Sequence, residues 1–143
     1  ARVPIAPEIE RLVAGLAKVY HDKAPVIETE VGQGLTFRGD AGDFLEMAGN
    51  LLDNACKWCR STVRISVTGS PGREIRMVVA DDGPGIPEEA VETLLQRGTR
   101  LDENTPGHGI GLAVVKELAE SFGGTLEIGR SELGGAQFEI TIP

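Results

Sequence analysis

The sequence predicts a two-layer α/β sandwich, in which three main helices pack on a mixed, largely antiparallel sheet. Segments with helical periodicity alternate with short segments that alternate apolar and polar residues, and Gly or Pro punctuates most connections. A length of 143 residues suits one domain and buries about two-thirds of the unfolded surface without disulfides. We therefore expect residues 1–143 to form a single domain.

Four segments are expected to be helical. In the first, apolar residues recur at three- and four-residue steps. Asp40 can cap the second helix, and Gly123 can stop the last one. The expected bounds are about 6–23, 41–59, 87–96 and 109–122, of which 87–96 is short.

About six strands are expected, mostly in hairpins, over 25–31, 35–38, 62–69, 73–80, 125–130 and 136–142. The first two strands are predicted to form a hairpin-like connection through Gly32-Gln33-Gly34, and Pro71-Gly72 suits a turn between the next two. Residues 97–108 have no clear period, and we interpret them as a mobile lid.

Composition excludes several classes of protein. A net charge of −8 argues against duplex nucleic acid as a partner. No stretch approaches the ~18 apolar residues of a membrane span, and the first seven residues lack the features of a signal peptide. Two cysteines are too few for a disulfide framework and favour a reducing, cytoplasmic compartment.

The second predicted helix has a polar side with two amides and an ammonium. At about 100° per residue, Asn50, Asn54 and Lys57 fall within about 60° of one another, and apolar residues fill the opposite arc. A solvated surface is the alternative, although exposed helix faces favour Glu, Lys and Arg over Asn. Amide oxygens one turn apart suit Mg²⁺, and Lys57 can reach a phosphate.

Cys56 and Cys59 have the C-x-x-C spacing of redox and metal sites. Both fall on the apolar arc and no second pair of ligands exists in the sequence, so we expect buried, inert thiols. Trp58 stands at the edge of the polar side, where it can either line a flat ligand such as adenine or pack at the margin of the core.

Two glycine-rich loops complete the candidate site. The first runs Asp81-Asp82-Gly83-Pro84-Gly85-Ile86 after a strand, where a carboxylate can accept a hydrogen bond from an amino group and glycines let a ring approach the backbone. The second runs Gly107-His108-Gly109-Ile110-Gly111-Leu112 and opens a helix, whose free N–H groups favour anions. Its spacing is neither that of a P-loop nor that of a Rossmann fingerprint.

In this order the motifs resemble those of sensor histidine kinases. Residues 50–57 are similar to their N box, 81–87 to their G1 box and 107–114 to their G2 box. The resemblance covers essentially the whole chain and is greatest to the PhoQ-type branch. It implies the Bergerat ATP-binding fold of the superfamily of gyrase, Hsp90, histidine kinases and MutL.

The resemblance also implies roles for individual residues. Asp81 would bind the adenine amino group, and Asn54 with Asn50 would hold Mg²⁺ against the phosphates. Lys57 and Arg100 would contact phosphate, which makes Asn50, Asn54, Lys57 and Arg100 the implied catalytic residues. The residues expected around the nucleotide are Asn54, Lys57, Trp58, Asp81, Gly83, Gly85, Ile86, Arg97, Arg100, Gly107, His108, Gly109, Ile110, Gly111 and Leu112.

Three positions depart from the family pattern. Leu94-Leu95 stands where the family usually has Phe, and leucine can still anchor the lid. Thr105 replaces a second lid arginine, which predicts weaker phosphate contact or slower transfer. His108 replaces a commoner polar residue, and it could bind a metal or a phosphate or have no role.

Asn50 bears on the reaction. Gyrase and Hsp90 have a Glu there that activates water, and an amide cannot abstract a proton. We therefore expect poor hydrolysis and transfer of the γ-phosphoryl group to a histidine on a separate helical dimerisation domain, for relay to an aspartate of a response regulator. Neither His21 nor His108 resembles the acceptor, so this domain alone is expected to be a monomer that binds ATP without phosphorylating itself.

The dimerisation, sensor and transmembrane domains of such a kinase are not in the sequence. The resemblance thus implies a domain on the cytoplasmic side of the bacterial inner membrane in a longer protein. Three alternatives stay open: a nucleotide-binding module without catalysis, a hydrolytic ATPase, and a serine kinase of the anti-sigma type.

Overall fold

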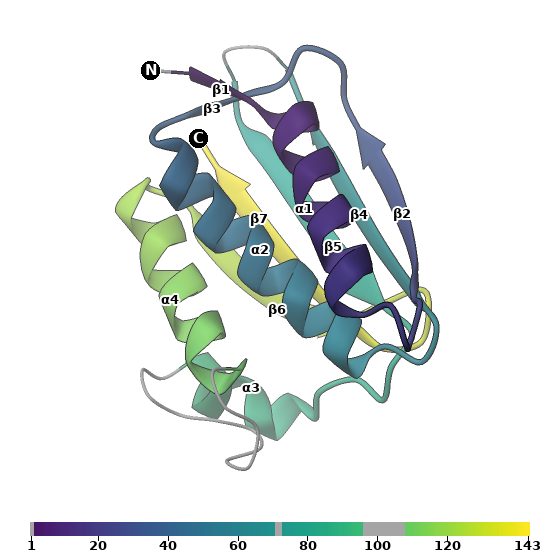
Figure 1. Cartoon of the computed structure of the whole chain (residues 1–143). Helices are drawn as coiled ribbons and strands as arrows, with labels where there is room; N and C mark the ends of the chain where they lie inside the picture. Colours follow the sequence, from purple (N-terminus) through teal and green to yellow (C-terminus); the bar gives the residue numbers. More distant parts are fainter. Residues whose placement is uncertain (1, 71–72, 96–107) are drawn as a thin grey trace.

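Three helices lie on one face of a five-stranded sheet, and a short helix lies at one end (Figure 1). The computed structural model describes residues 2–70, 73–95 and 108–143. Within these ranges the elements are β1 (Arg2–Pro4), α1 (Ile5–Val19), β2 (Val26–Val31), β3 (Thr36–Arg38), α2 (Ala41–Trp58), β4 (Thr62–Gly69), β5 (Ile75–Asp81), α3 (Glu88–Leu95), α4 (His108–Ser121), β6 (Thr125–Arg130) and β7 (Ala136–Ile142).

The large sheet has the order β2-β4-β5-β7-β6. β2 pairs with β4 in parallel, and the other three neighbouring pairs are antiparallel. β1 and β3 form a separate antiparallel pair, in which Val3 lies opposite Phe37. The predicted two-layer sandwich with a mixed, largely antiparallel sheet is therefore confirmed.

The predicted hairpin through Gly32-Gln33-Gly34 is wrong. β2 pairs with β4, and β3 pairs with β1, a strand that the sequence did not predict. The glycines signal a change of direction, but they do not determine which distant strand becomes the partner. The first helix also ends earlier than expected, at Val19, where the C-cap residue Tyr20 leaves the helical conformation with a φ of −102° and a ψ of 31°.

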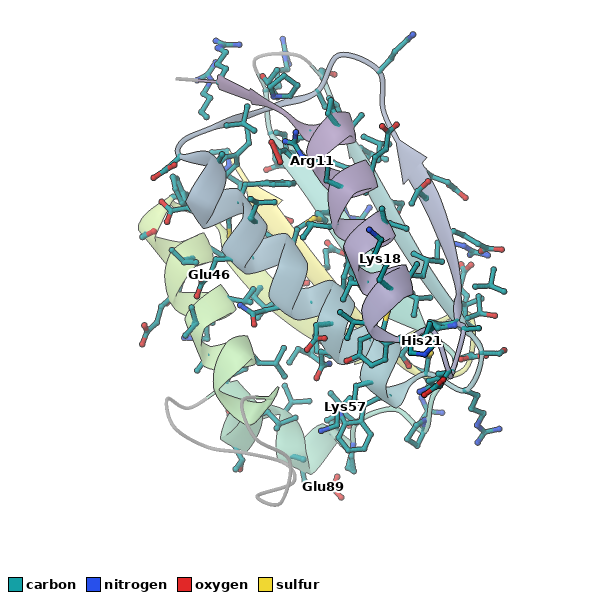
Figure 2. All side chains as sticks on the ribbon, viewed as in Figure 1. Arg11, Lys18, His21, Glu46, Lys57 and Glu89 are labelled. Carbon is teal, nitrogen blue, oxygen red and sulfur yellow. The ribbon has the colours of Figure 1, made fainter. Side chains whose placement is uncertain are left out.

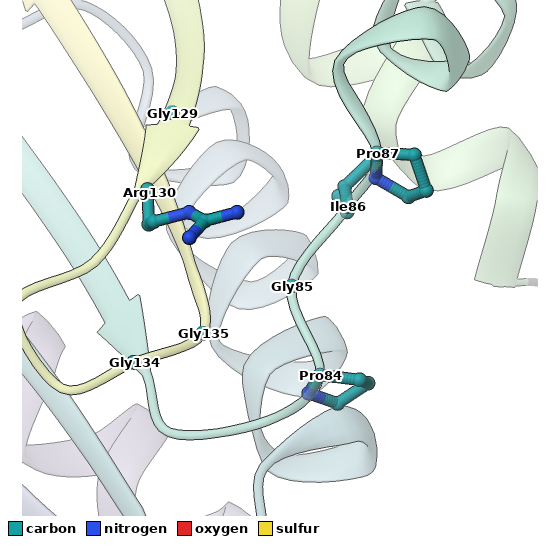
Figure 3. Close-up of a pocket in the computed structure, with 8 residues that line it drawn as sticks. All are labelled: Pro84, Gly85, Ile86, Pro87, Gly129, Arg130, Gly134 and Gly135. Atoms are coloured by element: carbon teal, nitrogen blue, oxygen red, sulfur yellow. The ribbon is translucent and has the colours of Figure 1, made fainter.

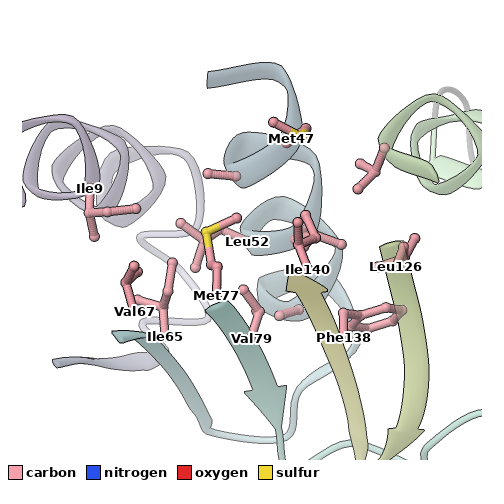
Figure 4. Packing of buried hydrophobic residues seen from close by; sticks show 14 of the residues in the cluster. Ile9, Met47, Leu52, Ile65, Val67, Met77, Val79, Leu126, Phe138 and Ile140 are labelled. Carbon is pink, nitrogen blue, oxygen red and sulfur yellow. The ribbon is translucent and has the colours of Figure 1, made fainter. Parts of the chain in front are cut away.

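Alternating residues of the central strands form the core beneath the helices (Figure 4). Val63, Ile65 and Val67 of β4 are each at most 1% exposed and lie on the helix side of the sheet. Leu51 and Leu52 of α2 are fully buried in the same cluster. Burying such a side chain contributes roughly 1.5–3 kcal/mol, so this cluster fixes α2 firmly on the sheet.

Helix α2 begins as the sequence predicts. The side chain of Asp40 accepts a hydrogen bond from the Gly42 N–H at 3.1 Å and caps the first turn. The helix then runs across the sheet to Trp58, at the end where β5 finishes and α4 starts (Figure 1). No helix in the described part of the chain combines the length and apolar character needed to cross a membrane.

Candidate functional site

The three sequence motifs meet at one end of the sheet, the lower end in Figure 1. Helix α2 ends there at Trp58, β5 ends at Asp81, and α4 begins at His108. Helix α2 packs against both α4 and β5, so side chains from elements far apart in the sequence come together.

Asn50 of α2 faces the first turns of α4. Its Nδ2 donates to the carbonyl of Glu46 at 2.7 Å. Its Oδ1 lies so near Gly111 that a Cβ at Gly111 would be only 2.8 Å away. The absence of a side chain at Gly111 therefore lets the two helices bring Asn50 and the glycine-rich start of α4 together.

Asn54 lies one turn further along α2. The residue is only 8% exposed and belongs to the same helix as Asn50 and Lys57. Its carboxamide oxygen is a neutral donor of the kind that a hard cation such as Mg²⁺ accepts.

Lys57 has an unpartnered cation at the end of α2 (Figure 2). Its Nζ is buried, and no residue in the described ranges accepts a hydrogen bond from it. The same atom lies 4.7 Å from the centroid of the Trp58 ring, which is a favourable cation–π distance. Such an ammonium, next to an aromatic face, is suited to an anionic group attached to a flat ring system.

Asp81 is a buried carboxylate, 2% exposed, at the end of β5. Its Oδ1 accepts hydrogen bonds from the N–H groups of Gly83 at 2.9 Å and Ala136 at 3.2 Å. Burial raises the pKa of this carboxyl above its ordinary value, and these two hydrogen bonds oppose the rise. No hydrogen bond from a described residue reaches Oδ2, so this oxygen can accept one from a ligand amino group.

Two glycines allow the backbone to close around Asp81. A Cβ at Gly83 would lie 2.3 Å from the Trp58 carbonyl oxygen, and one at Gly135 would lie 2.2 Å from Asp81 Oδ1. The Gly135 N–H also donates to the Asp81 carbonyl at 3.0 Å. The loop after β5 thus packs closely against both the end of α2 and the turn that joins β6 to β7.

Asp82 fastens the same loop to the segment that follows α2. Its Oδ1 accepts from the N–H groups of Arg60, Ser61 and Thr62 at 2.8–3.1 Å, and its Oδ2 accepts from Ser61 Oγ at 2.9 Å. Partial burial acts to raise the pKa of Asp82, but the hydrogen bonds from Ser61, Thr62 and Arg60 outweigh it and lower the pKa to about 2.

A cleft of about 510 Å³ lies between the loop after β5 and the ends of β6 and β7 (Figure 3). The Arg130 side chain extends from β6 toward this loop. Gly85, which has a left-handed φ of 79°, and Ile86 line the cleft, and the sequence predicts both at the nucleotide. The lining residues are Pro84, Gly85, Ile86, Pro87, Gly129, Arg130, Gly134 and Gly135.

The remaining predicted residues divide into three groups. Leu112 is 3% exposed and Leu94 is 2% exposed, and both pack in the core. His108, Gly109 and Ile110 form the first turn of α4. Most of the predicted lid, including Arg97, Arg100, Thr105 and Gly107, lies outside the described residues.

The two cysteines are buried and free, as the sequence predicts. Burial, followed by the charges of Cys59 and Asp53, raises the pKa of Cys56 to about 12. Burial also raises the pKa of the Cys59 thiol. Thiols with raised pKa values are poor nucleophiles and poor metal ligands at neutral pH.

Sequence reasoning missed three contributors to this region: Asp82, Ala136 and Lys23. The Gly134-Gly135 pair stands between the last two predicted strands, where it suggests only a turn, and yet Gly135 contacts Asp81. The Lys23 Nζ donates to the carbonyl of Lys57 at 2.8 Å, and no spacing rule connects these two residues.

Comparison with known proteins agrees with this geometry. A model of the family described as histidine kinase-, DNA gyrase B-, and HSP90-like ATPase matches residues 39–143. The sensor protein PhoQ of Escherichia coli strain K12 is 42% identical over 137 residues, which are 96% of this chain and 28% of that protein.

Two solved structures are similar over the whole chain. The mycobacterial sensor histidine kinase MprB has a TM-score of 0.86 at 26% identity, with 100% of this chain and 96% of that chain covered. Full-length ShkA in complex with AMPPNP has a TM-score of 0.84 at 28% identity, with 100% of this chain and 30% of that chain covered. The chain spans a little over a quarter of the length of PhoQ. As the motifs indicated, it belongs to the family of histidine kinase-, DNA gyrase B- and HSP90-like ATPases.

Proposed function

We propose that this chain is the ATP-binding catalytic domain of a sensor histidine kinase. It binds Mg²⁺-ATP beside the end of α2 and donates the γ-phosphoryl group to a histidine of a helical dimerisation domain. From there the group passes to an aspartate of a response regulator. The similarity to the sensor histidine kinase MprB supports the kinase assignment, the similarity to the sensor protein PhoQ supports a sensory role, and the AMPPNP in the ShkA structure supports a nucleotide ligand.

Two observations carry the proposal: the buried Lys57 ammonium at the end of α2, which donates to no described residue, and the buried Asp81 carboxylate at the end of β5, an element against which α2 packs. A cation suits the phosphates, and a carboxylate acceptor suits the adenine amino group. One ligand that has both groups therefore accounts for both buried charges.

The amides of α2 fit a magnesium ion. Asn50 Oδ1 and the Asn54 carboxamide are neutral oxygen donors of the kind that Mg²⁺ accepts alongside phosphate oxygens and water. In this proposal Asn50 and Asn54 hold the ion, which neutralises charge on the phosphates. Arg97 and Arg100 would add contacts to the phosphates.

Asn50 favours transfer over hydrolysis. Its Nδ2 donates to the Glu46 carbonyl, which orients the side chain. The side chain is an amide, and an amide cannot take a proton from water. Phosphoryl transfer instead needs a positioned nucleophile and neutralised charge. The acceptor imidazole nitrogen forms a bond to the γ-phosphorus, the bond from that phosphorus to the bridging oxygen breaks, and ADP leaves.

Calorimetry with AMPPNP, with and without Mg²⁺, tests the site. Wild type is expected to bind AMPPNP more tightly with Mg²⁺ than without it. The Asn54→Ala variant should bind AMPPNP and lose most of this increment, because it removes a proposed ligand of the ion. Glu46→Gln, on the exposed part of the same helix (Figure 2), is the matched control and should keep the increment.

The kinase assignment needs a second experiment. Labelled ATP is mixed with this domain and the helical dimerisation domain of the longer protein that contains it. Label that appears on a histidine of the helical domain supports the proposal. Rapid steady-state release of ADP by the domain alone, with no labelled histidine, would instead identify a hydrolytic ATPase.

A further inference from the structure

The C-terminal end of helix α2 is held by a lysine that lies outside all three motifs. Lys23, in the turn between α1 and β2, donates from its Nζ to the carbonyl of Lys57 at 2.8 Å. The carbonyls of the last helical turn have no partner within the helix, and a cation there is stabilised by the helix dipole. Lys23 therefore acts as a side-chain cap on the turn that carries Lys57 and Trp58.

The parallel pairing of β2 with β4 brings this turn to the end of α2. Val26 lies opposite Thr62, and its N–H donates to the Ser61 carbonyl at 2.7 Å. Because Thr62 follows α2 by only a few residues, the start of β2 lies beside the end of the helix. A hairpin between β2 and β3 would not require this proximity.

The turn is fastened to α2 at a second point. The hydroxyl of Tyr20 donates to Asp53 Oδ1 at 2.8 Å and approaches the Asp53 carbonyl at 3.3 Å. Asp53 precedes Lys57 by about one helical turn. Ala24, directly after Lys23, has a φ of 50°, a conformation that is uncommon for a non-glycine residue.

The position of the Lys57 ammonium depends on the last turn of α2. The ammonium is buried, it donates to no residue that the structure describes, and it lies 4.7 Å from the Trp58 ring centroid, an arrangement that is unfavourable unless the last turn of α2 is kept in place. Helix ends fray readily, and a frayed last turn would let Lys57 move toward solvent. Asp81 is instead held by hydrogen bonds from Gly83 and Ala136, and Lys23 acts on it only through its charge, as the smallest of the influences on that carboxyl.

We propose that Lys23 is a positioning residue: by capping the last turn of α2, which also carries Trp58, it keeps Lys57 in place for the phosphate end of the nucleotide. The proposal rests on the proposed function for its ligand. It predicts that loss of the Lys23 ammonium weakens binding of a nucleotide in proportion to its phosphates, while recognition of the base at Asp81 is retained.

The test compares AMPPNP with AMP by calorimetry, in Lys23→Met, which keeps the aliphatic stem, and in Lys23→Arg, which keeps a cationic donor. Lys23→Met is expected to weaken AMPPNP binding roughly five- to tenfold and AMP binding less than twofold. Lys23→Arg should restore most of the AMPPNP affinity. Lys18→Met is the matched control, because Lys18 is exposed on α1 and its side chain has no partner in the described part of the chain (Figure 2).

A double-mutant cycle with Lys57→Met sharpens the result. If Lys23 acts through Lys57, the Lys23→Met change should have little further effect on AMPPNP affinity once Lys57 is gone. Equal losses for AMP and AMPPNP would show a general structural role and overturn the proposal. If Lys18→Met lost as much AMPPNP affinity as Lys23→Met, the loss would follow from the net charge of the protein, and this outcome would also overturn the proposal.

Fluorescence separates this proposal from the proposed function, since Trp58 is the single tryptophan. Without nucleotide, Lys23→Met should shift the Trp58 emission to longer wavelength, and Lys18→Met should not. If wild type bound no AMPPNP but the Lys23→Met shift appeared, the nucleotide assignment would fail while the role of Lys23 in holding Trp58 survived. An unchanged emission in Lys23→Met would refute that role.

Discussion

The backbone N–H of Ala136 donates a hydrogen bond to Asp81 Oδ1 at 3.2 Å, across 55 positions of the sequence. This contact and the Gly83 N–H at 2.9 Å occupy one carboxylate oxygen and turn the other away from both donors. The orientation of Asp81 is therefore set by two segments other than its own strand.

Replacing Asp81 with Asn should change which base is preferred. The Asn variant can keep an oxygen toward Gly83 and Ala136, and it then presents an NH₂ group where Asp81 presents Oδ2. AMPPNP affinity should fall by about 10–100-fold, whereas a triphosphate with a 6-oxo purine should bind the variant at least as well as wild type. Calorimetry with both ligands measures this, and a parallel loss for both would contradict the role of Oδ2.

The same variant should not be less stable. Burial raises the pKa of Asp81, so the ionised carboxylate at neutral pH lowers the free energy of unfolding, and this cost is relieved as the pH falls through the raised pKa. Asn carries no such charge. Urea unfolding at pH 7 should therefore show an unfolding free energy equal to or above that of wild type.

Asp82 should contribute to stability in the opposite sense. Replacing it with Ala removes the acceptor for three backbone N–H groups, which should lower the free energy of unfolding by about 1–3 kcal/mol at pH 7. The pKa of Asp82 is lowered from 3.8 to about 2, so this contribution is present above pH 3.8 and is lost as the pH falls toward 2. Unfolding curves for wild type and Asp82→Ala should thus converge in acid, and a constant gap down to pH 2 would argue against this role.

Gly135 and Gly129 offer a matched pair within one cleft. A Cβ at Gly135 would lie 2.2 Å from Asp81 Oδ1 and 2.5 Å from the Gly83 nitrogen, whereas a Cβ at Gly129 would meet nothing within 4 Å. Gly135→Ala should lower both the unfolding free energy and AMPPNP affinity, because the loop must move away from Asp81. Gly129→Ala should change neither by more than about 0.5 kcal/mol, and equal effects of the two variants would contradict the packing described.

The two cysteines should react with a thiol reagent only when the protein unfolds. Burial raises the pKa of Cys56 to about 12, so little thiolate exists at pH 8 and a thiol reagent has no direct access. Native protein should react with Ellman's reagent slowly, and two thiols should react at once in denaturant. Rapid labelling of either cysteine in native protein would show that this end of α2 is open.

The sequence predicted elements that depend on local patterns and missed contacts that depend on the fold. The Asp40 cap and the final strands over 125–130 and 136–142 could be predicted, since capping and alternation are local properties. The pairing of β2 with β4 could not, because two glycines suggest a turn without naming a partner strand. The parts of the site with family motifs were recognised, whereas Lys23 and Ala136 reach it only through that pairing and the β6–β7 turn.

Both outer edges of the large sheet carry ionised side chains, Glu28 and Glu30 on β2 and Glu127 and Arg130 on β6. An edge strand presents unpaired backbone groups on which a second molecule could build a continuous sheet. Placing two copies of β2 side by side would bring carboxylates against carboxylates, and that repulsion opposes growth of the sheet. The carboxylates on β2 thus oppose self-association through that edge at high concentration.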